Sequence, residues 1–171
     1  MRISIIGNSG SGKSTLATLL ATTHHLAMLD LDTVAWEAGK VAVSRDPIVA
    51  AGAVDTFCQG NQHWVIEGCY GSLIAATWRY SPVLLFVEPG VEVCVANCLA
   101  RPWEPHKYKS KQEQDAKLEF LLAWVGAYYT REGELSLHAH QTLFDAYTGT
   151  KHKLVGRPGR DFLDKFASWA A

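Results

Sequence analysis

A glycine-rich stretch near the start of the sequence has the spacing of a phosphate-binding loop. Residues 7–14 read GNSGSGKS and match the pattern G-x-x-x-x-G-K-[S/T] at every fixed position. Glycine allows backbone conformations that are closed to other residues, so successive N–H groups can surround a phosphate. We expect Lys13 to reach the β- and γ-phosphates of a nucleotide, and the Ser14 hydroxyl to bind Mg²⁺.

This stretch, called the phosphate loop below, stands between a predicted strand and a predicted helix. Residues 3–6 form a β-branched run typical of a buried strand, and leucines follow with helical spacing over residues 15–23. The amino end of that helix adds a partial positive charge beside the bound anion. The predicted nucleotide-binding residues here are Gly7, Asn8, Ser9, Gly10, Ser11, Gly12, Lys13, Ser14 and Thr15.

Strand-like and helical segments alternate along most of the chain. Further strands are predicted at residues 26–29, 64–66, 83–87 and 153–155. Helices are predicted from Asp46-Pro47 onward, around residues 74–78, over residues 91–99, from a capping box at residues 110–113 through Tyr128, over residues 136–147 and at the end of the chain. This alternation predicts an α/β fold, with a five-stranded parallel sheet and helices on both faces. A length of 171 residues fits one domain, residues 1–171.

Composition excludes several classes of protein. Hydrophobic residues make up 48% of the chain and charged residues 19%, a globular balance that argues against disorder. Sixteen basic and 17 acidic residues nearly cancel, which argues against a nucleic-acid coat or a polybasic membrane surface. No apolar run approaches the ~20 residues of a membrane span. We expect a cytoplasmic protein without a membrane or nucleic-acid partner, and the sequence leaves its oligomeric state open.

The four cysteines, at positions 58, 69, 94 and 98, form no C-x-x-C pair. We expect them to be small buried residues in a reducing compartment. The alternative is that Cys94 and Cys98, four residues apart on one helix face, contact a metal together.

Several stretches resemble small-molecule kinases. Residues 8–15 after an N-terminal strand resemble the adenylate, shikimate and gluconate kinase group. Residues 31–36 (LDTVAW), residues 64–70 (WVIEGCY) and the helix at residues 118–124 more closely resemble the bacterial DNA-topology-modulation proteins, which are related to adenylate kinase and often labelled shikimate kinases. Residues 101–108 resemble a signature of one subgroup. The resemblance implies a P-loop NTPase fold of three layers with a short lid at residues 101–112, and ATP and Mg²⁺ as cofactors.

Acidic residues lie at or just beyond the ends of the predicted strands. Asp32 follows the second strand, at the carboxyl edge where open α/β sheets bind ligands. The resemblance implies that Asp32 contacts the acceptor hydroxyl and helps to orient or deprotonate it, and either Asp32 or Asp30 could hold the metal shell. Glu67 and Glu88 compete to be the second acidic metal contact, reached through water. The resemblance favours Glu67, although the family usually has Asp there.

The basic stretch at residues 101–111 resembles the lid of these kinases. Cations that close over a transferring phosphoryl group stabilise its developing charge. Arg101 is the predicted catalytic cation, with His106, Lys107 and Lys109 as further candidates. Related lids usually carry several arginines, whereas this one has a single arginine among lysines.

Two further arginines are candidates for ligand contacts. Arg157 follows the last predicted strand, where related kinases hold the adenine, and is assigned to the nucleotide. Arg79 could bind an anionic group of the acceptor.

The sequence therefore predicts an ATP- and Mg²⁺-dependent phosphotransferase acting on a small hydroxylated or phosphorylated metabolite. The acceptor stays open. Glu67-Gly68-Cys69 stands where shikimate kinases have a glycine triplet, and Tyr70-Gly71 does not supply the acidic-Gly-aromatic-Pro-Arg run of nucleoside-monophosphate kinases. The alternative is a nucleotide-binding regulator with weak ATP hydrolysis that acts on a macromolecular partner.

Overall fold

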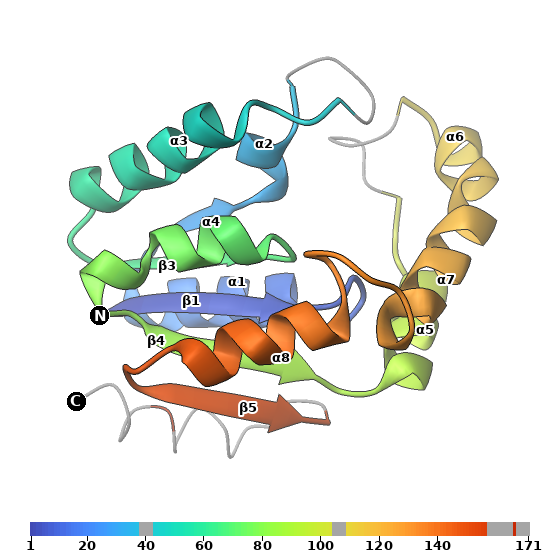
Figure 1. Cartoon of the computed structure of the whole chain (residues 1–171). Helices are drawn as coiled ribbons and strands as arrows, with labels where there is room; N and C mark the ends of the chain where they lie inside the picture. The colour runs from blue at the N-terminus through green and yellow to red at the C-terminus, as the bar shows by residue number, and fades with distance from the viewer. Residues whose placement is uncertain (38–42, 104–108, 157–165, 167–171) are drawn as a thin grey trace.

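The computed structural model describes residues 1–37, 43–103, 109–156 and 166 (Figure 1). Its strands are β1 (Arg2–Gly7), β2 (Ala27–Asp30), β3 (Trp64–Gly68), β4 (Val83–Glu88) and β5 (Lys151–Val155). They pair in parallel in the order β2-β3-β1-β4-β5. The predicted five-stranded parallel sheet is confirmed, and its first strand lies at the centre.

Helices connect the strands, mostly where the sequence predicts them. They are α1 (Lys13–His24), α2 (Asp32–Ala35), α3 (Pro47–Gly60), α4 (Gly71–Ala76), α5 (Val91–Leu99), α6 (Lys111–Ala116), α7 (Leu118–Gly126) and α8 (Leu137–Ala146), with 3₁₀ turns η1 (Trp78–Tyr80) and η2 (Ala127–Tyr129). Asp46 caps α3 by accepting from the N–H groups of Ile48 and Val49, and Ser110 caps α6 by accepting from that of Glu113.

The structure corrects one predicted helix and adds another. The long helix expected from residue 111 through Tyr128 is divided at Lys117, whose N–H donates to the carbonyl of Gln114 three residues back. This tighter pattern ends the α-helix before α7 begins. The short helix α2, directly after β2, has no counterpart among the predictions. The terminal helix predicted around Phe162 and Trp169 lies outside the described residues.

The two faces of the sheet carry two separate apolar cores. Alternate β1 residues point to opposite faces: Ile3 and Ile5 pack with α1, whereas Ile6 packs with α3, α4 and α8. Figure 1 shows α1 on one face of the sheet and α3, α4 and α8 on the other. Phe166 belongs to the core on the α1 side and is fully buried. The chain therefore has three layers, with helices on both faces of the sheet, as predicted.

Helices α5 and α7 lie beyond the carboxyl edge of the sheet, where they pack on each other (Figure 1). Their contact is made by Cys94, Cys98 and Val125, all buried. The phosphate loop leaves β1 at the same edge and lies against this helix pair. In the described part of the chain, no helix has the length and apolar character needed to cross a membrane.

Candidate active site

The shape of the phosphate loop depends on glycines at positions where the backbone has little space or a positive φ. Gly10 and Gly12 have φ angles of 76° and 95°, in the region that favours glycine. A Cβ atom on Gly10 would lie 2.3 Å from the carbonyl oxygen of Cys94, and one on Gly7 would lie 2.3 Å from that of Val87. The loop backbone can therefore lie this close to β4 and α5 only with glycine at these positions.

Two asparagines fix the loop to helices α5 and α7. The Asn8 side chain accepts from the N–H of Ser9 at 2.9 Å and donates to the carbonyl of Val125 at 3.1 Å. Asn97 of α5 donates to the carbonyl of Gly10 at 2.8 Å. Since α5 precedes the predicted lid and α7 follows it, the phosphate loop is bonded to elements on both sides of the lid.

Lys13 lies inside the curve of the loop. Its Nζ donates to the carbonyl oxygen of Asn8 at 3.0 Å, and the residue is 6% exposed. Burial lowers the pKa of the ammonium, but the charges of Cys69, Glu67 and Asp32 outweigh burial and hold the pKa above its usual value. Lys13 therefore stays positively charged, as a phosphate-binding lysine must, and it lies among acidic groups.

Ser14 and Glu67 meet at the end of β3. The Ser14 hydroxyl donates to Oε1 of Glu67 at 2.6 Å, and Glu67 is 3% exposed. Hydroxyl and carboxylate oxygens are ligands that Mg²⁺ accepts, and this ion usually takes the rest of its shell from phosphates and waters. The pair therefore fits the metal site that the sequence predicts.

Glu88, the competing acidic residue, is engaged elsewhere. It ends β4 and accepts a hydrogen bond from the phenol of Tyr129. The geometry favours Glu67 over Glu88 as the partner of Ser14. Among the described residues, no group of three or more His, Cys, Asp or Glu side chains is placed to hold a metal ion, so a joint site of Cys94 and Cys98 has no further ligands there.

Asp32 lies at the carboxyl edge of the sheet, as predicted, but its contacts were not foreseen. Its backbone N–H donates to Oδ1 of Asp30 at 2.9 Å, and its own Oδ1 accepts from the Tyr70 hydroxyl at 2.7 Å. The Tyr70 oxygen accepts in turn from the indole N–H of Trp36, also at 2.7 Å. Asp30 is paired with Glu67 in the register of β2 and β3. The edge therefore gathers Lys13 and three carboxylates.

The predicted cations of the lid are only partly described. Arg101 lies two residues after the end of α5, is half-buried, and its guanidinium contacts the sulfur of Cys98 at 3.9 Å. The backbone of Lys109 is held near α6, because its N–H donates to the Glu113 carboxylate at 3.0 Å. His106, Lys107 and the nucleotide-binding candidate Arg157 lie outside the described residues.

Arg79 is not placed for the predicted acceptor contact. It lies in η1, which leads into the amino end of β4, and its guanidinium pairs with Asp55 at 3.2 Å. The adjacent Tyr80 carbonyl accepts from Arg2 at the first position of β1. Arg79 therefore lies at the edge of the sheet opposite the phosphate loop.

A buried histidine supports the turn after β3. His140 is fully buried, and its Nε2 lies 2.7 Å from the carbonyl oxygen of Cys69. A carbonyl only accepts, so Nε2 carries the proton and Nδ1 accepts from the Tyr128 hydroxyl at 2.7 Å. Burial lowers the pKa of His140 to about 4, so the imidazole is neutral near pH 7. The sequence offered no sign of this role, because His140 has no partner nearby in the chain.

The cysteines differ from the prediction at one position. Cys58, Cys94 and Cys98 are buried thiols outside any disulfide, as expected, whereas the Cys69 thiol is half-buried. Cys69 lies beside the phosphate loop, with its sulfur 3.9 Å from the Ser9 hydroxyl.

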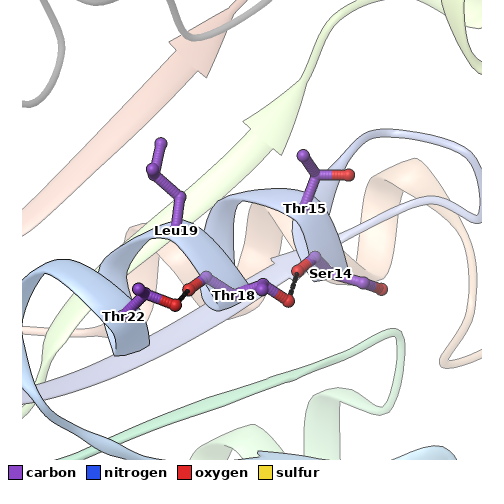
Figure 2. A pocket seen from close by; sticks show the side chains of 5 residues that line it. All are labelled: Ser14, Thr15, Thr18, Leu19 and Thr22. Carbon is purple, nitrogen blue, oxygen red and sulfur yellow. Dashed lines mark hydrogen bonds between the residues drawn. The ribbon is translucent and has the colours of Figure 1, made fainter.

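A groove runs from the phosphate loop along α1. Figure 2 shows Thr15 and Leu19 on one side of the helix and Ser14, Thr18 and Thr22 along the other. The hydroxyls of Thr18 and Thr22 each donate at 2.8 Å to a carbonyl four residues back. Because these hydroxyls are bonded within the helix, the groove of about 530 Å³ presents mainly methyl groups and Leu19 beyond its Ser14 and Thr15 end.

Comparison with solved structures places the fold. A sugar kinase from Janibacter sp. HTCC2649 has a TM-score of 0.56 and 11% identity to this chain, over 99% of this chain and 93% of that one. Shikimate kinase from Aquifex aeolicus vf5 has a TM-score of 0.53 and 15% identity, over 98% and 94%. The chain has a P-loop kinase fold. No family model and no curated protein matches the sequence, so the closer resemblance to DNA-topology-modulation proteins stays a prediction.

Proposed function

We propose that this chain is an ATP- and Mg²⁺-dependent phosphotransferase that moves the γ-phosphoryl group of ATP to a small hydroxylated or phosphorylated metabolite. The observation that carries the proposal is the 2.6 Å hydrogen bond from Ser14 to Glu67, next to the buried Lys13. A loop that only bound phosphate would need the glycines and the lysine. It would not need a carboxylate, such as that of Glu67, bonded to the Ser14 hydroxyl. The names of the two similar structures, a sugar kinase and a shikimate kinase, support the same reaction class.

The residues would divide the work as follows. Residues 7–15, with Arg157, would hold the nucleotide, and Lys13 would stabilise charge on the β- and γ-phosphates. Ser14 and Glu67 would hold Mg²⁺, with Asp32 as a further acidic contact, and the ion would neutralise phosphate charge when bound. Asp32 would orient the acceptor hydroxyl and take its proton, and Arg101 would stabilise the transferring group from the lid.

Binding measurements test the proposal directly. Thermal shift and isothermal titration with ATP and Mg²⁺ should show stabilisation of about 2.7 kcal/mol at a ligand concentration 100 times Kd. A panel of sugars, shikimate and nucleoside monophosphates, screened with ATP present, should contain an acceptor that is phosphorylated. Slow hydrolysis with no acceptor, together with nucleotide-dependent binding of a macromolecule, would favour the regulator instead.

Two lysines in similar settings, Lys13 and Lys151, allow a test variant and a matched control. Lys13→Ala should abolish ATP turnover and leave the circular dichroism spectrum unchanged. Lys151→Ala removes a lysine that is likewise bonded to backbone carbonyls, but at the opposite edge of the sheet, and ATP affinity should not change. Retained phosphoryl transfer in the Lys13 variant would refute the proposal.

A further inference from the structure

We infer that Tyr70 and Trp36 are positioning residues that fix the carboxylate of Asp32 for the phosphoryl acceptor. The inference rests on the proposed function, because it concerns the residue that would receive the acceptor hydroxyl. It assigns a role to two aromatic side chains that neither bind phosphate nor carry charge.

The chemistry of the three groups sets the direction of both hydrogen bonds. An indole N–H only donates, so the Tyr70 oxygen is the acceptor in its 2.7 Å contact with Trp36. The phenol has one proton, and Oδ1 of Asp32 lies 2.7 Å away from the same oxygen. An ionised carboxylate only accepts, so the Tyr70 proton points to Asp32. The two hydrogen bonds, together called the relay below, therefore run in one direction: Trp36 donates to Tyr70, and Tyr70 donates to Asp32.

Tyr70 keeps its proton in this setting. Burial raises the pKa of its phenol, and the negative charge of Asp32 raises it further. A serine or threonine hydroxyl could reorient, whereas a tyrosine ring packed at a strand end holds its oxygen in one place.

The backbone around the relay is also fixed. Tyr70 lies two residues after the end of β3 and Trp36 directly follows α2, so the relay joins the chain after β3 to the chain after β2. Leu31 donates its N–H to the Glu67 carbonyl at 2.9 Å, and a Cβ atom on Gly68 would lie 2.7 Å from that of Leu31. Both segments are therefore locked together within a few residues of Asp32.

Trp36 is also held by its backbone and by its ring. Its backbone forms an antiparallel bridge with Ser44, and its ring meets that of Tyr70 edge-on, with centroids 6.3 Å apart. Edge-to-face rings pack favourably and restrict each other's rotation. The indole N–H is thus aimed at Tyr70 by packing as well as by the hydrogen bond.

An exchange measurement tests the relay without ATP or an acceptor. In ¹⁵N-labelled protein, the Trp36 indole N–H should exchange with solvent about fivefold faster in Tyr70→Phe than in the natural protein, because one hydrogen bond is lost. Asp32→Asn should also accelerate exchange while Tyr70 is present, and should add nothing in the Tyr70→Phe background. Equal effects of Asp32→Asn in both backgrounds would overturn the relay.

A matched variant controls for the loss of any phenol at this edge. Tyr129→Phe removes a hydroxyl that also donates to a carboxylate at a strand end, that of Glu88. It should leave the exchange of the Trp36 indole unchanged. An equal acceleration in Tyr129→Phe would show a general loosening of the edge and would overturn the inference.

Kinetics test the functional half of the inference. With the acceptor that the panel identifies, Tyr70→Phe should lower kcat about 10- to 100-fold, because the acceptor is less well oriented. The KM for ATP should stay unchanged, because the phosphate loop and Lys13 keep their contacts. A rise in the KM for ATP with an unchanged kcat would overturn it. If no acceptor is phosphorylated, the proposed function fails, and the exchange experiment still decides whether the relay exists.

Discussion

The Ser14 hydroxyl and the Glu67 carboxylate are joined by a 2.6 Å hydrogen bond that links the start of α1 to the end of β3. Ser14 is exposed and Glu67 is buried, so a carboxylate in the interior fixes the orientation of a hydroxyl at the surface. An oriented hydroxyl can replace a water of Mg²⁺ without first losing rotational freedom. Loss of a supporting partner of this kind typically lowers metal affinity or activity about 10- to 100-fold.

Glu67→Gln tests this support. The amide keeps the size and an acceptor oxygen but removes the charge, so we expect the Mg²⁺ concentration for half-maximal ATP turnover to rise about 10- to 100-fold. A Mg²⁺ titration of ATP turnover measures it. Glu88→Gln is the control at the end of β4, on the other side of β1, and its Mg²⁺ dependence should match that of the natural protein. An unchanged Mg²⁺ dependence in Glu67→Gln would show that Glu67 is not part of the metal site.

Gly10 and Gly12 separate steric clash from backbone strain. Gly12→Ala adds a methyl group into open space at a φ of 95°, so only the strain of about 1–2 kcal/mol should appear in the free energy of unfolding. Gly10→Ala has similar strain and also drives a methyl group to 2.3 Å from the Cys94 carbonyl. Urea unfolding should show a larger loss for Gly10→Ala. Equal losses would mean that α5 moves aside at no cost.

The buried imidazole of His140 predicts a loss of stability in acid. The pKa of His140 is about 4 in the folded protein, against an ordinary value of 6.5. Between these pH values the unfolded chain binds more protons, so the free energy of unfolding falls as the pH drops from about 6.5 to about 4. At about 1.4 kcal/mol per pH unit, the loss approaches about 3 kcal/mol.

Urea unfolding at several pH values measures this effect. His140→Gln should flatten the dependence between pH 6.5 and pH 4, whatever it does to stability at neutral pH. His138→Gln changes an exposed histidine of the same helix and should leave the dependence as it is. The same slope in all three proteins would contradict the assignment of the slope to His140.

Asn97 gives the phosphate loop its bond to α5. Asn97→Ala removes the donor to the Gly10 carbonyl, and we expect a loss of about 1 kcal/mol in ATP binding, or about fivefold in Kd, because the loop is less well fixed. Isothermal titration measures it. Asn61→Ala removes an equivalent amide-to-carbonyl bond at the end of α3, and the Kd for ATP should not change. Equal Kd values in both variants would argue against a role for Asn97.

Local patterns were sufficient to predict the sheet and the phosphate loop. The β-branched runs, the fixed spacing of Gly7, Gly12, Lys13 and Ser14, and the cap at Asp46 each depend on neighbouring residues, so they can be read from the sequence. The division of the helix at Lys117 could not be predicted, because the residues on both sides of it favour helix equally. The choice of Glu67 over Glu88 as a metal contact depended on the resemblance and stays a prediction, which the bond from Ser14 to Glu67 supports.

The rest of the site could not be predicted from the sequence, because it depends on contacts between residues far apart in the chain. Trp36 and Tyr70 are 34 residues apart, Tyr70 and Asp32 are 38 apart, and His140 and Cys69 are 71 apart. None of these pairs leaves a periodic or spacing signal. Arg79 was misjudged for the same reason: the sequence placed it between two strands but could not tell which edge of the sheet it would reach.

The central position of β1 has a consequence for how the chain is made. β1 pairs with β3 and β4 and not with β2, so the strands first in sequence cannot form a sheet by themselves. Gly7 packs on Val87 and Gly10 packs on Cys94, which are synthesised 80 and 84 residues later. Long-range pairing of this kind folds slowly and late. The glycine-rich motif is therefore synthesised well before α5, and the phosphate loop can take its folded shape only after α5 has left the ribosome.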